Sequence, residues 1–108
     1  MHYNVGDILL VKFPFTNLKK SKKRPILVVK SQNNLGDIVC FQITSNAEQT
    51  NLLEIKKENL SHSIFAINSF VKYDKCFTLS SDIIEKKLAK VDSSFLEEVK
   101  HLFCSEIF

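Results

Sequence analysis

Short apolar runs, separated by clusters of turn-forming residues, dominate most of the chain. Runs of this length that lack helical spacing are typical of buried strands. We therefore expect strands over residues 8–13, 25–29, 38–44, 52–56 and 64–73, then two short strands at 78–79 and 87–91 on either side of a single turn near Asp82. Residues 15–23, between the first two strands, are expected to form a long polar and basic loop.

Helical spacing appears near the C-terminal end of the chain. Ser94, with Glu97 three residues later, fits a capping box. It is followed by an apolar stripe at helical spacing, which we expect to pack on the core: Phe95, Val99, Leu102 and Phe103. Several short strands with one terminal amphipathic helix predict a mainly β fold, a small closed or half-closed barrel. The length of 108 residues predicts one domain over residues 1–108.

Composition narrows the class of protein. A chain with 44% hydrophobic and 25% charged residues is expected to fold as a globular domain. Apolar runs stay shorter than the roughly 18 residues that cross a bilayer, and residues 1–7 resemble no export signal. We expect a cytoplasmic protein with no membrane partner. Cys40, Cys76 and Cys104 are widely spaced, so we expect buried free thiols, no metal site and no cofactor.

The cations are unevenly placed. The net charge is only +3, but five of the six residues from Lys19 to Arg24 are cationic. Clustered cations suit a phosphate backbone, although a solvated lysine-rich loop has the same composition. Arg24 is the only arginine of the chain. Its planar guanidinium matches two phosphate oxygens in a way that an ammonium group cannot.

A succession of short motifs covers nearly the whole chain. They are Gly-Asp-Ile-Leu-Leu-Val at 6–11, Phe-Pro-Phe-Thr at 13–16, Lys-Arg-Pro-Ile-Leu-Val at 23–28, Gln-Ile-Thr-Ser at 42–45, Ser-Phe-Val-Lys-Tyr-Asp-Lys at 69–75 and, more loosely, Leu-Ala-Lys-Val at 88–91. In this order they resemble the MazF/PemK family of type II toxins. The resemblance implies an SH3-like barrel, a homodimer, sequence-specific cleavage of single-stranded RNA, and a cognate antitoxin protein that blocks the cleft.

The resemblance also implies a catalytic pair. Metal-free cleavage of RNA uses the 2′-OH of the substrate as nucleophile, and it needs a base, an acid and a group that stabilises charge on the phosphoryl oxygens. The resemblance assigns charge stabilisation to Arg24, with proton donation as a secondary role, and a hydroxyl contact with the phosphate to Thr44. The alternatives are an Arg24 that pairs with a carboxylate at the surface and a Thr44 that caps the end of its strand.

RNA binding is expected on a larger set of residues: the clustered cations Lys19, Lys20, Lys22 and Lys23, and, from the resemblance, Ser45, Lys72 and Asp74. Lys72 and Asp74 are two residues apart and share one face of a strand. Some family members have Arg where this chain has Lys72, so the charge is kept and the bidentate fork is lost. Asp74 is either a base or a partner that holds a cation. No histidine lies between Gly6 and His62, where some members have one, so the general base stays unassigned.

Two other classes of function share this fold. CcdB-like toxins poison DNA gyrase without cleaving anything, and an inactive relative would bind nucleic acid only. The pairing of Arg24 with Thr44 favours the nuclease. Incubation with single-stranded RNA separates the three hypotheses.

Overall fold

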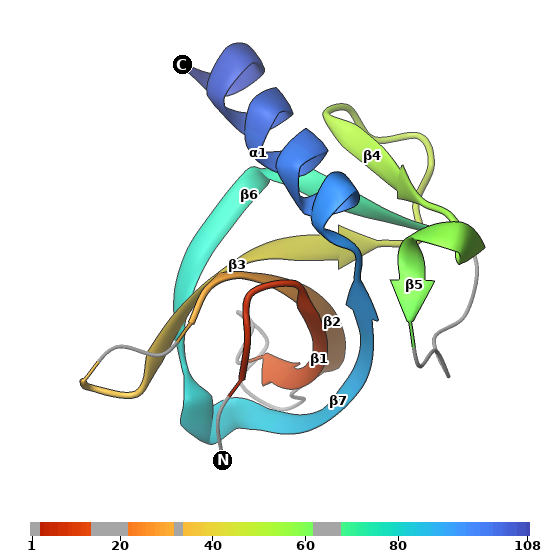
Figure 1. Cartoon of the computed structure of the whole chain (residues 1–108). Coiled ribbons are helices and arrows are strands. Elements are labelled where there is room, and N and C mark those ends of the chain that lie inside the picture. The colour runs from red at the N-terminus through yellow and green to blue at the C-terminus, as the bar shows by residue number, and fades with distance from the viewer. Residues whose placement is uncertain (1–2, 14–21, 32–33, 62–67) are drawn as a thin grey trace.

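A computed structural model describes residues 3–13, 22–31, 34–61 and 68–108. Within these ranges the chain forms seven strands, a C-terminal helix and two short 3-10 turns (Figure 1). In chain order the elements are β1 (Asp7–Phe13), β2 (Lys22–Lys30), β3 (Asp37–Thr44), β4 (Leu52–Ile55), η1 (Lys57–Asn59), β5 (Leu60–Ser61), β6 (Ser69–Ser80), η2 (Ser81–Ile83), β7 (Ile84–Val91) and α1 (Ser93–Ile107).

All seven strands belong to one antiparallel sheet in the order β4-β6-β3-β2-β1-β7-β5. The sheet curls strongly, so that β6, β3, β2, β1 and β7 form a half-open barrel with α1 lying across it (Figure 1). The expected mainly β barrel with a C-terminal helix is therefore confirmed. No helix in the described ranges is long and apolar enough to cross a membrane.

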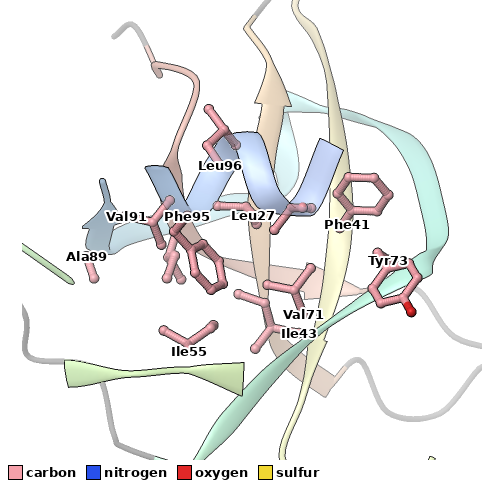
Figure 2. Packing of buried hydrophobic residues seen from close by; sticks show 12 residues of the cluster. Leu27, Phe41, Ile43, Ile55, Val71, Tyr73, Ala89, Val91, Phe95 and Leu96 are labelled. Atoms are coloured by element: carbon pink, nitrogen blue, oxygen red, sulfur yellow. The ribbon is translucent and has the colours of Figure 1, made fainter. Parts of the chain in front are cut away.

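Buried apolar side chains form two clusters on opposite faces of the sheet. Because successive residues of a strand point to opposite faces, Ile8 and Leu27 lie in one cluster while their neighbours Leu9 and Ile26 lie in the other. The first cluster joins the sheet to α1 and β4, as Figure 2 shows. In it the ring of Phe41 meets the ring of Phe103 edge to face, with centroids 5.2 Å apart.

The apolar stripe of α1 is confirmed, but the predicted capping box is wrong. Asp92 is the N-cap, and its side chain accepts a hydrogen bond from Phe95 N at 2.7 Å. The helix thus begins before Ser94, which lies inside its first turn. Aspartate is as strong an N-cap as serine, and Asp92 directly follows β7, where the chain still has the extended conformation that an N-cap needs.

The strand boundaries differ from the expected ones in four places, one of which is β7, which begins at Ile84 and not at Lys87. β2 begins at Lys22, so the end of the expected loop already belongs to the sheet, while residues 14–21 lie outside the described ranges. β6 is one strand over Ser69–Ser80, so residues 78–79 are not a separate strand, and its expected start at 64–67 also lies outside the described ranges. β5 was not expected. The single turn near Asp82 is confirmed as η2.

The three cysteines are free, but only one of them is buried as expected. Cys40 has no exposed surface, and burial, with the nearby Cys76 thiol, raises the pKa of its thiol to about 12. Cys76 and Cys104 are exposed. Cys76 lies on the part of β6 where the burial pattern becomes mostly exposed, and Cys104 lies near the C-terminal end of α1.

Candidate active site

Arg24 and Thr44 lie on adjacent strands, just beyond the paired part of β2 and β3. Ile26 pairs with Gln42 in this antiparallel ladder. Two further steps along both strands lead from that pair to Arg24 on β2 and to Thr44, the last residue of β3. Residues opposite one another in an antiparallel pair are neighbours on the same face of the sheet. The paired residues end at Ile26 and Gln42, and the same register continued by two residues sets Arg24 and Thr44 opposite one another on adjacent strands.

Both residues continue the face that carries the second apolar cluster. Ile26 on β2 and Cys40 on β3 belong to that cluster, and the two-residue period of a strand extends its face to Arg24 and to Thr44. Arg24 also pairs with Val11 of β1, another member of the cluster. Arg24 is half-buried and Thr44 is 8% exposed. The pair thus lies where a packed apolar face ends, with restricted access to water.

The Thr44 hydroxyl already makes a backbone contact. Its Oγ1 accepts a hydrogen bond from Asn46 N at 3.1 Å, which is the capping contact considered as an alternative role. A hydroxyl oxygen has two lone pairs and one proton, so accepting this bond leaves the O–H free to donate. The capping contact and a contact with phosphate are therefore compatible in the same side chain.

Lys72 and Asp74 do share one side of β6 as expected, and they pair with each other. Lys72 is 8% exposed, and its Nζ lies 2.9 Å from Asp74 Oδ1 and 2.9 Å from the Thr50 carbonyl. Asn51 Nδ2 donates to Asp74 Oδ2 at 3.0 Å. Burial raises the pKa of Asp74, but the hydrogen bonds from Lys72 and Asn51 and the charge of Lys72 outweigh it and lower the pKa below its usual value. Asp74 is thus ionised at neutral pH and holds a cation in place.

The structure places the basic segment only in part. Lys19 and Lys20 lie outside the described ranges, and of Lys22 only the backbone, in β2, is described. Lys23 is exposed, and because it precedes Arg24 in the strand it points to the opposite face. Its Nζ lies 3.6 Å from Glu85 Oε2. The face that carries Arg24 and Thr44 therefore does not include Lys23.

Of the remaining polar residues, only Ser45 was a candidate for RNA binding. Ser45 is exposed and follows Thr44 directly. His101 is exposed on α1, while His2 and His62 lie outside the described ranges. Within those ranges no three side chains of His, Cys, Asp or Glu are grouped as a metal site would need.

Sequence reasoning missed Gln42 and Asn51 as residues of this site. Gln42 is half-buried, pairs with Ile26 on one side and with Lys72 on the other, and shares the face of Thr44. An amide in an otherwise apolar strand, two residues before Thr44, was the signal that could have found it. Asn51 has a left-handed backbone with φ of 58°. The only signal of this in the sequence is that asparagine adopts this conformation more often than most residues.

The family of the chain follows from a comparison with family models. The model of PemK-like, MazF-like toxins of type II toxin–antitoxin systems matches residues 4–106. The chain therefore belongs to this toxin family. Comparison with curated protein sequences gives no significant match.

Solved structures show the same fold at low sequence identity. The crystal structure of MazF (Form-I) from Deinococcus radiodurans has a TM-score of 0.77 at 19% identity, over 99% of this chain and 97% of that one. The crystal structure of MazE–MazF (Form-II) from the same organism has a TM-score of 0.74 at 18% identity, over 99% of this chain and 96% of that one. The structure of an endoribonuclease in complex with its cognate antitoxin from a mycobacterial species has a TM-score of 0.72 at 13% identity, over 97% of this chain and 92% of that one.

Proposed function

We propose that this chain is an endoribonuclease toxin that cleaves single-stranded RNA at specific sequences. The observation that supports the proposal is that Arg24 and Thr44 lie on one face of the adjacent strands β2 and β3, two residues beyond the pair of Ile26 with Gln42, with Thr44 buried and Arg24 half-buried. The half-buried guanidinium supplies a fixed positive charge with a planar fork of donors, and the threonine supplies one hydroxyl donor. Both groups suit a phosphate on which negative charge builds up.

The reaction that fits these groups is an internal transfer within the RNA. The 2′-oxygen forms a bond to the adjacent phosphorus while the bond from phosphorus to the 5′-oxygen breaks. The 2′-OH loses its proton, and the leaving 5′-oxygen gains one. The products are a 2′,3′-cyclic phosphate and a 5′-hydroxyl. Arg24 stabilises the extra charge on the phosphoryl oxygens, and Thr44 donates to one of them.

We expect the purified protein to cleave single-stranded RNA in the presence of EDTA, because the 2′-OH provides the nucleophile and Arg24 the charge. The measurement is the mapping of RNA ends with and without chelator. The matched control is the same oligonucleotide with a single 2′-deoxy residue at the cleaved position, which should stay intact. Activity that disappears in EDTA and returns with Mg²⁺, or cleavage next to the deoxy residue, would contradict this mechanism.

We also propose that the protein acts as a single domain in the cytoplasm, as a homodimer that a cognate antitoxin protein inhibits. Membership of the type II toxin family supports the antitoxin, since the family is defined by such pairs. For the dimer, light scattering at micromolar concentration should give twice the mass of 12.4 kDa. A mass of one chain at that concentration would count against it.

The two other classes of function predict different results in the same experiment. A CcdB-like toxin would leave RNA intact and inhibit gyrase, and an inactive relative would bind RNA without cutting it. The Arg24–Thr44 arrangement favours cleavage over both.

A further inference from the structure

Side-chain contacts fix the start of the loop between β3 and β4, residues 45–51. Asn46 N donates to Thr44 Oγ1 at 3.1 Å, and the side chain of Asn46 accepts from Glu48 N at 3.0 Å. The Asn46 carbonyl also accepts from Gln49 N at 3.5 Å. Thr and Asn side chains commonly close turns through contacts of this kind. The first half of the loop is therefore built around Asn46 and is attached to the Thr44 hydroxyl.

The second half of the loop is fastened to β6, which lies between β3 and β4 in the sheet (Figure 1). The Thr50 carbonyl accepts from Lys72 Nζ at 2.9 Å, and the Asn51 carbonyl accepts from Tyr73 N at 3.1 Å. The Asn51 side chain donates to Asp74 Oδ2 at 3.0 Å. Asparagine enters the left-handed region, which Asn51 occupies, more readily than most residues other than glycine. Asn51 thus combines the backbone turn that ends the loop with a side-chain bond to β6.

We propose that Asn51 is a positioning residue for RNA cleavage: by pinning the loop to β6 it keeps the Asn46 amide on the Thr44 hydroxyl, so that the hydroxyl proton is directed to the scissile phosphate. The proposal rests on the proposed function, because it assigns Asn51 a role in that reaction. One lone pair of Oγ1 is occupied by the Asn46 N–H, which restricts the rotation of the hydroxyl. A donor that is already oriented stabilises the transition state without reorganising first.

The kinetic test is the variant Asn51→Gly, which keeps the left-handed backbone accessible and removes only the amide. We expect kcat to fall by about tenfold, which is a smaller decrease than removal of a complete hydrogen-bond donor causes. KM should change by less than about twofold. In a Thr44→Val background the same substitution should have no further effect, because the hydroxyl through which it acts is absent. Steady-state rates are measured with RNA in excess over protein, well below the unfolding temperature of each variant.

The matched control is Asn68→Gly. Asn68 is the other non-glycine residue of the described ranges with a left-handed backbone, with φ of 74°, and it is exposed. This substitution should leave kcat unchanged. An equal loss of kcat from Asn51→Gly with and without the Thr44 hydroxyl would show a general structural effect and would overturn the positioning role. An unchanged kcat in Asn51→Gly would do the same.

A second measurement does not depend on activity. Hydrogen exchange of the Asn46 amide should be at least about tenfold faster in Asn51→Gly than in the unmodified protein, since the bond to Thr44 would open locally. Asn68→Gly should leave it unchanged. If the unmodified protein cleaves no RNA, the proposed function fails and this inference fails with it. If it cleaves RNA while Asn46 exchange is the same in Asn51→Gly, only the positioning role is overturned.

Discussion

The variant Arg24→Lys is expected to cleave RNA at least about a hundredfold more slowly than the unmodified protein, comparable to the loss of a preorganised donor at an oxyanion. The formal charge is kept, so the long-range attraction to RNA should hardly change. The planar fork that holds two phosphoryl oxygens as charge builds on them is lost. We expect the affinity for RNA to change by only a few-fold. Single-turnover rates and equilibrium binding at the same salt concentration measure the two effects separately.

The comparison variant is Lys20→Ala, which removes a charge of the basic segment and leaves Arg24 in place. It should weaken RNA binding and flatten its dependence on salt, while the rate at saturating RNA stays nearly unchanged. If Arg24→Lys cleaves as fast as the unmodified protein, Arg24 has no role in the transition state, and the basic segment is only an electrostatic patch.

The largest effect on stability is expected from Phe41→Ala, which should lower the free energy of unfolding by about 3–5 kcal/mol. Phe41 is 2% exposed and lies between the sheet and α1 (Figure 2). Its ring contacts the ring of Phe103 edge to face, with centroids 5.2 Å apart. Its removal leaves a cavity in the cluster that joins the sheet to the helix, and the aromatic contact is lost as well. Denaturant unfolding followed by circular dichroism gives the difference.

Phe108→Ala provides the matched control for the same change of side chain. Phe108 also makes an edge contact with Phe103, at 5.4 Å, but it is 90% exposed. Its removal should cost less than about 1 kcal/mol, because a substitution at an exposed position removes little buried surface. Equal losses from the two variants would mean that the cluster beneath α1 does not carry the stability assigned to it.

Most of the strands could be predicted from the sequence, because each is marked by alternating or continuous apolar residues within its own short segment. The pair of Arg24 and Thr44 came from the resemblance to the toxin family, and its role in catalysis stays a prediction; the structure places the two residues on adjacent strands and on one face of the sheet. The full length of β6 was not predicted, because Asp74 and the polar residues near it interrupt the apolar pattern. The strand continues through them with an irregular register beside β3, where polar side chains are tolerated. Lys23 was expected in a loop, but β2 begins at Lys22, so Lys23 lies in the strand and points to the face opposite Arg24. Strand ends are set by pairing with distant residues, which a local pattern does not contain.

The contacts of Asn51 lay beyond sequence reasoning for a different reason. Its carbonyl and amide reach β6 residues that are distant in the chain, and its backbone conformation depends on them. The pairing of Lys72 with Asp74 could be foreseen, because residues that are two apart in a strand lie on the same face. The burial of Lys72 against the Thr50 carbonyl could not, because it depends on the path of the loop.

The central position of β1 in the sheet has a consequence for the order of events during synthesis. Among the described strands β1 is made first, yet one of its two neighbours is β7, which is made last of them. Until Ile84–Val91 has been made, that edge of β1 exposes unpaired backbone groups, which are prone to pair with other chains. The strands that carry Arg24 and Thr44 can pair much earlier. During synthesis β2 and β3 can therefore pair in an open sheet, and the barrel closes only after β7 has been made.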